Sequence, residues 1–125
     1  MPTLEKIKAN FNPDLVILEA TGVARPGDIR STLSKYGAKT VKKISVITIV
    51  DTLRFDVLID VMNPLITAQI EKADIVVINK IDRVDEEKVS EIRSAVSSLN
   101  PGVDIVPISA EKGINVQSVT KRFIS

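Results

Sequence analysis

The sequence contains no cysteine and no histidine, and only 3% of its residues are aromatic. Without cysteine there is no disulfide, and without both residue types there is no thiolate or imidazole ligand for a metal ion. Carboxylate oxygens remain as metal ligands, and these suit Mg²⁺. Because aromatic residues are scarce, the core has to be built from Val, Ile and Leu, a bias that is typical of buried parallel strands.

A charge imbalance and a long apolar run are also missing. The chain has 17 basic and 16 acidic residues, so its net charge of +1 does not indicate nucleic acid or an anionic membrane as a partner. No apolar stretch approaches the roughly 20 residues that cross a bilayer, and the N-terminus is polar, without signal-peptide features. We therefore expect a cytoplasmic protein, with residues 1–125 forming a single domain that has its own core.

Short apolar runs alternate with helical patterns along the chain. The pattern predicts strands over residues 15–18, 44–50, 75–78 and 105–106, and helices over residues 3–10, 26–36, 54–72, 85–99 and 115–123. Proline inside a helix costs about 3 kcal/mol, so the helix over 54–72 is expected to break at Pro64, with Asn63 capping a second helix. Asp85 is expected to cap the following helix, and Asn100-Pro101-Gly102 to end it.

Strands that alternate with helices indicate right-handed βαβ crossovers. We expect an α/β fold in which three layers, α/β/α, enclose a mainly parallel sheet of about four strands. Pro107 suits a strand end or an edge strand, because it cannot donate to a central ladder. Ligands bind such sheets at the carboxyl ends of the strands, where the sequence places Glu19, Asp51, Asn79 and Ser109.

The strand over 75–78 runs into Asn79-Lys80-Ile81-Asp82. The Asp82 carboxylate can accept hydrogen bonds from N1 and N2 of guanine together, a donor pair that adenine lacks. The aliphatic stem of Lys80 can lie over the flat base, and the Asn79 amide can tie the loop to its neighbours. The alternative is an ordinary polar turn ahead of a helix, and this short pattern does not decide between the two by itself.

The last strand runs into Ser109-Ala110-Glu111-Lys112-Gly113. The N–H of Ala110 can donate to guanine O6, its small side chain lets the base approach, and Gly113 permits a left-handed turn. Taken alone this is a common loop. It follows the Asn79–Asp82 loop by one βα unit and lies at the same sheet edge, so the two together favour a guanine pocket with Ser109, Ala110 and Glu111 in its second wall.

Glu19-Ala20-Thr21-Gly22 follows the strand predicted over 15–18. The Glu19 carboxylate can hold a Mg²⁺-bound water or orient an attacking water, and the N–H of Gly22 can contact a γ-phosphate. On the residues alone, a strand-ending turn is the simpler interpretation. Asp51 also ends a strand, as does the phosphorylated aspartate of receiver domains, but that site needs an acidic cluster for which Glu19 alone is a poor substitute.

The segment from Glu19 to Pro26 resembles the Glu-x-Thr-Gly-x-Ala-x-Pro segment of the metallochaperone GTPases related to CobW, HypB and UreG, and CobW-type members are the most similar. Further segments follow in that family's order, at residues 47–51, 69–74, 79–82 and 99–101. The resemblance covers almost the whole chain.

The resemblance implies a P-loop NTPase-like fold that binds GTP or GDP with Mg²⁺. It implies that Glu19 takes a Walker B-type role near Mg²⁺. It also implies a set of guanine-binding residues: Asn79, Lys80, Asp82, Ser109 and Ala110. Proteins of this family use GTP hydrolysis to deliver metal ions to target enzymes or cofactors.

The sequence departs from the family in one large respect. It contains neither the first strand nor Gly-x-x-x-x-Gly-Lys-Ser/Thr, the P-loop, and without that loop the β- and γ-phosphates lose most of their binding partners. We therefore expect weak or no GTP hydrolysis by this chain alone. The family's Cys- and His-bearing metal-handling segments are missing as well.

Omission of the first strand leaves its two neighbours about 9–10 Å apart, with unpaired backbone groups between them. The strand over 15–18 can shift onto the strand over 44–50, a second copy can lend a strand, or a separate P-loop-bearing chain can fill the slot. We expect a shift or self-association for this chain alone. The chain is then a guanine-recognising domain, a non-catalytic interaction module or split subunit, or a truncated GTPase.

Overall fold

The computed structural model describes residues 2–19, 30–31, 35 and 42–123. The chain divides into two compact units, Met1–Ile44 and Ser45–Ser125. The first unit contains helix α1 (Pro2–Phe11), which confirms the predicted N-terminal helix. Asn12 follows the helix with a φ of 43°, and its N–H donates to the carbonyl of Lys8 at 2.9 Å. The helix thus ends on a left-handed residue.

The strand predicted over residues 15–18 is wrong. Residues 15–19 form neither helix nor strand, and the apolar side chains of residues 15–18 are between 46% and 73% exposed. Local hydrophobicity favours a strand here, but an extended segment becomes a strand only when its backbone groups pair with a neighbour. The described sheet takes no strand from this segment, so the expected shift onto the strand over 44–50 is wrong as well. The helix predicted over 26–36 lies mostly outside the described residues.

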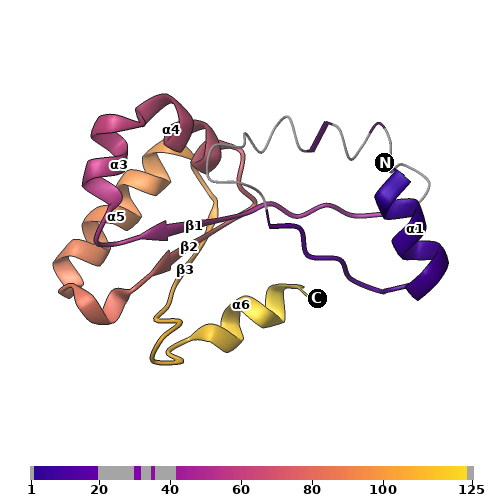
Figure 1. Ribbon diagram of the computed structural model, residues 1–125. Helices are drawn as coiled ribbons and strands as arrows, with labels where there is room; N and C mark the ends of the chain where they lie inside the picture. The colour runs from indigo at the N-terminus through magenta and orange to yellow at the C-terminus, as the bar shows by residue number, and fades with distance from the viewer. Residues whose placement is uncertain (1, 20–29, 32–34, 36–41, 124–125) are drawn as a thin grey trace. The chain divides into compact units, whose positions relative to one another are not determined.

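The second unit contains a parallel sheet of three strands in the order β1-β2-β3 (Figure 1). The strands are β1 (Ile47–Asp51), β2 (Ile75–Asn79) and β3 (Asp104–Pro107). The parallel sheet is confirmed, with three strands in place of about four. Asp51 pairs with Asn79 in the β1–β2 register, so these two strands end level with each other. Pro107 ends β3, an edge strand of the described sheet, as its missing N–H predicts.

The helices of this unit are α3 (Phe55–Val61), α4 (Asn63–Glu71), α5 (Glu86–Leu99) and α6 (Val116–Phe123), with a short 3-10 helix η1 (Ile81–Arg83). The break before Pro64 is confirmed, but Met62 is the N-cap and Asn63 is already helical, so the predicted cap is one residue too late. The cap at Asp85 is confirmed, because its carboxylate accepts from the N–H of Lys88 at 2.8 Å.

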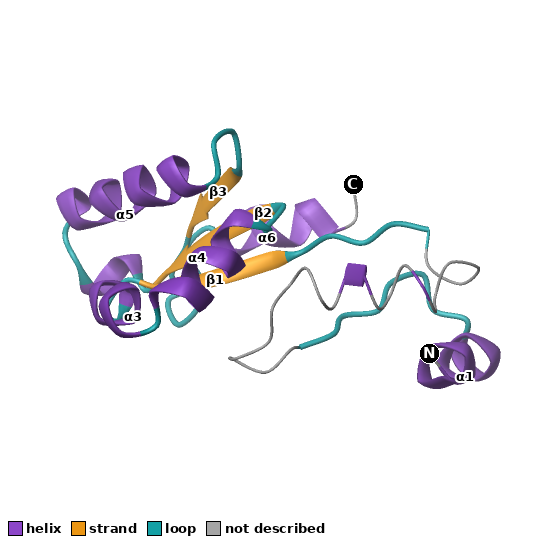
Figure 2. Ribbon diagram, turned by 90° about the horizontal axis from the view of Figure 1, so that it is seen from above, coloured by secondary structure: helices purple, strands orange, loops and turns teal. Residues whose placement is uncertain are grey.

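Alternate residues of β2 pack on opposite faces of the sheet. On one face Val76 and Ile78 join a core cluster with residues of α3, α4 and α5, and on the other Ile75 and Val77 pack with β3 and with Val119 of α6. Figure 1 shows α3, α4 and α5 on one side of the sheet and α6 on the other, and Figure 2 shows the same arrangement from above. The three-layer α/β/α architecture is therefore confirmed. None of the described helices has both the length and the apolar character needed to cross a membrane.

Candidate functional site

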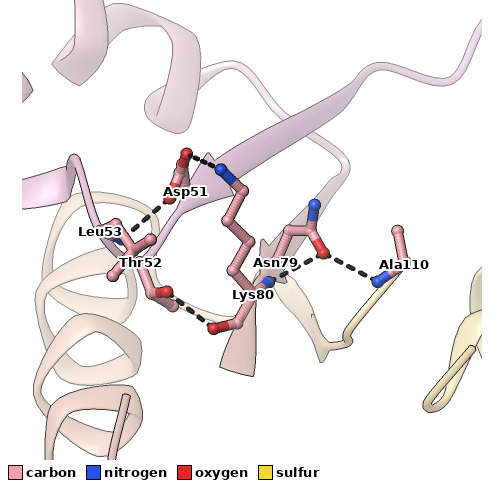
Figure 3. A network of polar contacts seen from close by, with 6 residues as sticks. All are labelled: Asp51, Thr52, Leu53, Asn79, Lys80 and Ala110. Carbon is pink, nitrogen blue, oxygen red and sulfur yellow. Dashed lines mark hydrogen bonds and ion pairs between the residues drawn. The ribbon is translucent and has the colours of Figure 1, made fainter. Parts of the chain in front are cut away.

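The two predicted loops lie side by side at the carboxyl ends of β2 and β3. Asn79 Oδ1 accepts from the N–H of Lys80 at 2.8 Å and from the N–H of Ala110 at 3.0 Å (Figure 3). The backbone adds a second connection, because the N–H of Ile81 donates to the carbonyl of Ile108 at 3.2 Å. The Asn79 amide therefore joins the first loop to the second directly.

Lys80 has an unusual backbone conformation. Its φ of 67° and ψ of 35° are left-handed, which costs a residue with a side chain about 1–2 kcal/mol. The carbonyl of Lys80 accepts from the Thr52 hydroxyl at 3.0 Å and from the N–H of Arg83 at 3.0 Å. These bonds hold the peptide in place and set the direction in which the Lys80 side chain leaves the backbone.

The Lys80 side chain reaches from the end of β2 to the end of β1. Its Nζ lies 2.8 Å from Asp51 Oδ2, and the lysine side chain keeps 44% of its surface exposed. Figure 3 shows the extended lysine running from its backbone to this carboxylate. An apolar stem with an exposed flank suits contact with a flat ligand.

Asp51 and Thr52 belong to this network although sequence reasoning did not include them among the site residues. Asp51 Oδ1 accepts from the N–H of Leu53 at 2.9 Å, and Thr52 is 2% exposed, with its N–H donating to the carbonyl of Asn79 at 3.2 Å. Partial burial alone would raise the pKa of the Asp51 carboxyl, but the hydrogen bonds from Lys80 and Leu53 outweigh it and leave that pKa below its usual value. For Asp51 the sequence did carry a signal, because its carboxylate ends a buried strand. For Thr52 the sequence carried no such signal.

Asp82 lies in η1, directly after this network. Its side chain is exposed, and among the described residues nothing donates a hydrogen bond to its carboxylate. The carboxylate thus keeps both oxygens open to a ligand that carries a pair of donors.

Ser109 is 1% exposed and organises the second loop. Its N–H donates to the carbonyl of Ile114 at 3.1 Å, its carbonyl accepts from the N–H of Ile114 at 2.9 Å, and its hydroxyl accepts from the N–H of Lys112 at 3.2 Å. Gly113 has a φ of 71°, the left-handed conformation that glycine adopts without strain. Ala110 and Glu111 are exposed on the outside of this closed loop.

Two predicted site residues, Glu19 and Gly22, belong to the first unit, Met1–Ile44. Glu19 lies in the first unit, is exposed, and does not end a strand, contrary to expectation. Gly22 lies outside the described residues. In the described part of the chain no group of three or more acidic residues is placed to hold a metal ion, and the role of Glu19 stays a prediction.

An open depression lies between α3 and α5, next to the site. Lys88 of α5 pairs there with Asp56 of α3 and with Glu91. The hydrogen bond that Lys88 donates to Asp56 is the main reason that the pKa of Lys88 lies above its usual value. None of the residues that line this depression belongs to either predicted loop, but it shares Thr52 and Leu53 with the polar network at the end of β1.

Comparison with known proteins adds the family. The model of the CobW/HypB/UreG nucleotide-binding domain matches residues 1–107. The chain is also 30% identical over 102 residues to a zinc-regulated GTPase metalloprotein activator 1 of Schizosaccharomyces pombe (strain 972 / ATCC 24843). That match covers 78% of this chain and 24% of the relative, so the chain spans about a quarter of the relative's length. No solved structure matches the chain significantly.

The family match includes Glu19 to Pro26 and the Asn79–Asp82 loop, and it ends just before Ser109. The family match therefore does not cover the second loop. Its assignment to the same site as the first loop depends on the hydrogen bond between Asn79 and Ala110. Since the match extends over most of the chain, and the three-stranded parallel sheet with its helices is consistent with an α/β P-loop NTPase-like fold, the chain belongs to the CobW/HypB/UreG nucleotide-binding domain family.

Proposed function

We propose that this chain recognises the guanine base of GTP or GDP through the Asn79–Asp82 and Ser109–Gly113 loops. The observation that carries the proposal is the hydrogen bond of 3.0 Å from the Ala110 N–H to Asn79 Oδ1. Guanine presents the N1 and N2 donors and the O6 acceptor on one edge, so its pocket needs a carboxylate and an N–H close together. The bond between the loops supports that juxtaposition of Asp82 and Ala110.

Each residue has a distinct task in the proposed pocket. Asp82 accepts from the base edge, and the exposed flank of Lys80 lies against the ring face. Buried Ser109 holds the second loop closed through its hydrogen bond with Lys112, and exposed Glu111 lies at the edge of the proposed pocket. The N–H of Ala110 is engaged with Asn79 in the structure, so binding of guanine O6 requires Asn79 to share or release that donor.

The phosphates require groups that this sequence does not contain. The 125 residues include no Gly-x-x-x-x-Gly-Lys-Ser/Thr, the loop whose backbone and lysine hold the β- and γ-phosphates. We propose that residues 1–125 are a partial GTPase-like domain that hydrolyses little or no GTP alone. Glu19 near Mg²⁺ and Gly22 near the γ-phosphate remain part of this proposal. We propose a metallochaperone role for a protein that contains this domain, because the relative is a zinc-regulated GTPase metalloprotein activator.

Titration of the chain with GDP and with ADP, followed by NMR, tests the guanine pocket. We expect GDP to bind more tightly, and we expect Asp82→Asn to weaken GDP binding about 5- to 150-fold, because a mismatched polar pair costs about 1–3 kcal/mol. Glu86→Gln, an exposed carboxylate on α5, is the matched control and should change nothing. Equal binding of the two nucleotides would overturn the proposal. If the chain hydrolyses GTP and Asp82→Asn abolishes this activity, only the proposal that the chain hydrolyses little or no GTP alone is contradicted.

A second candidate function is a non-catalytic interaction module or split subunit. The observation that favours it is β1, which lies at an edge of the described sheet and exposes 67% of Ile49. A strand from a P-loop-bearing chain or from a second copy would pair with this edge and cover the apolar side chain. Co-purification with such a chain, or a concentration-dependent dimer in light scattering, would support it. A monomer at all concentrations, with no co-purified P-loop chain, would contradict it.

A further inference from the structure

We propose that Asp51, at the end of β1, is a positioning residue for guanine recognition. It touches no part of the base, but it fixes the Lys80 side chain along the mouth of the pocket, so that the stem is in place before a nucleotide arrives. The inference rests on the proposed guanine pocket and adds to it a residue on a strand that carries neither of the base-reading loops.

The strand register explains why Asp51 can act on Lys80. Asp51 pairs with Asn79, so the residue that follows Asn79 leaves the sheet beside the end of β1. Three contacts then cross from the end of β1 to this point, and Figure 3 draws the first two of them. They are the Asp51–Lys80 ion pair at 2.8 Å, the bond from the Thr52 hydroxyl to the Lys80 carbonyl at 3.0 Å, and the bond from the Thr52 N–H to the Asn79 carbonyl at 3.2 Å.

The Asp51 carboxylate is itself held, which makes it a fixed anchor. Oδ1 accepts from the N–H of Leu53 at 2.9 Å, and Oδ2 accepts from Lys80. This local turn, in which an aspartate side chain accepts from the backbone two residues on, is typical of aspartate and asparagine. A longer side chain such as glutamate would not close it in the same way. The anchor is also partly protected from water, because only 25% of the Asp51 side-chain surface is exposed.

The Asp51 anchor orders the Lys80 side chain before a ligand binds. A free lysine side chain samples many rotamers, and ordering it on binding lowers affinity. Lys80 instead has both ends fixed, by the left-handed backbone at one end and by Asp51 at the other. The stem between them keeps its exposed flank in one orientation. Strained backbone that several contacts hold in place is found most often at ligand sites.

Asp51→Asn is the informative substitution, because asparagine keeps the oxygen that accepts from Leu53 and removes the charge that holds Lys80. We expect GDP binding, measured by NMR titration, to weaken about three- to fivefold, in keeping with a partly exposed ion pair. Asp104→Asn is the matched control: it breaks a carboxylate–cation pair at the opposite end of the sheet and should leave GDP binding unchanged. Urea unfolding of each variant verifies that the fold is retained.

A double-substitution cycle separates positioning from general support of the fold. Lys80→Met keeps an apolar stem but cannot pair with Asp51, so in that background Asp51→Asn should have no further effect on GDP binding. An undiminished effect there would overturn the inference. The inference would also be overturned if Asp51→Asn left the GDP affinity unchanged while Asp82→Asn abolished the preference for GDP. That result would still support the guanine pocket itself. If the unaltered chain shows no preference for GDP over ADP, the proposed function fails, and this inference fails with it.

A measurement without nucleotide tests the anchor alone. In the free protein the NMR signals of the Lys80 ε-methylene group should differ between the unaltered chain and Asp51→Asn, because only the former holds the ammonium group in one place. Identical signals would show that Asp51 does not order this side chain and would overturn the inference even if the pocket binds GDP.

Discussion

The polar side chains that follow the carboxyl ends of β1, β2 and β3 fall into two kinds. Thr52 and Ser109 are buried, and their hydroxyls form hydrogen bonds with the backbone of the two loops. Their role is therefore to hold the loops in position. Asp82 is exposed and has no donor among the described residues, so its chemistry is left for a ligand. A substitution of the first kind should change where the loops lie, and one of the second kind should change what they bind.

The same distinction applies to Asp85, whose carboxylate caps α5 by accepting from the N–H of Lys88. We predict that Asp85→Ala lowers the free energy of unfolding by about 1 kcal/mol, the usual cost of losing an N-cap. Urea unfolding followed by circular dichroism measures this loss. Ser90→Ala, on the exposed part of the same helix, is the control and should change stability by less than about 0.5 kcal/mol. Equal effects of the two substitutions would show that the cap contributes nothing.

Ile92 shows the contribution of apolar packing. It is 1% exposed and belongs to the cluster that joins α5 to the strands. We predict that Ile92→Ala destabilises the protein by about 2–5 kcal/mol, because it loses buried surface and leaves a cavity, while Ile92→Val costs about 0.5–1.5 kcal/mol. Urea midpoints of the two variants give the comparison. A loss below about 1 kcal/mol for the alanine variant would mean that α5 is not packed as described.

Helix α6 is connected to the sheet by an ion pair between Arg122 and Asp104 of β3. The hydrogen bond from Arg122 is the main reason that the pKa of the Asp104 carboxyl lies below its usual value. A carboxyl with a lowered pKa in the folded state adds stability above its unfolded pKa, and this stability disappears as the pH falls through the folded value. Part of the attachment of α6 should therefore be lost in acid.

We predict that Asp104→Asn destabilises the protein at pH 7 and that this difference shrinks as the pH falls below the ordinary value of 3.8 for an aspartate. Urea unfolding of both proteins across this range tests it. Because the pair is half exposed, raising the salt concentration should also reduce the difference at pH 7. A difference that stays constant with pH would show that the loss comes from packing and not from the charge of Asp104.

The elements that the sequence predicted are those with local causes. The run Ile75–Ile78 is apolar throughout and becomes a strand buried on both faces, and Asp85 caps α5 because its side chain reaches only three residues ahead. The strand over residues 15–18 was wrong because a strand depends on a partner elsewhere in the sequence. The cap at Asn63 was wrong by one residue because Met62 takes that position without any capping side chain.

The candidate site divides in the same way. The two loops were predicted because each follows directly from a strand and carries its own chemistry. The Asp51–Lys80 pair was not predicted, because it depends on the register that sets Asp51 opposite Asn79. Register is a property of two segments together, and the local pattern of either strand does not reveal it.

The two compact units of the chain differ in what they bury. Every residue that is buried among those the structure describes lies between Val50 and Ser109, inside the unit Ser45–Ser125. Both core clusters, on the two faces of the sheet, belong to this unit as well. A segment with its own core clusters and its own sheet has the main requirement for independent folding.

We therefore predict that a fragment of residues 45–125 folds cooperatively and retains the preference for GDP over ADP, because both base-reading loops and Asp51 lie within it. A single sigmoidal urea transition, together with dispersed NMR amide signals, would establish folding, and titration with the two nucleotides would establish selectivity. The exposed Ile49 on β1 makes self-association the expected difficulty, so Ile49→Thr is a useful companion: it keeps a β-branched residue in the strand and reduces the apolar edge. If both fragments give expanded, non-cooperative states, residues 1–44 contribute to the core of this domain, and the sheet and its two loops are not a self-sufficient nucleotide-recognition unit.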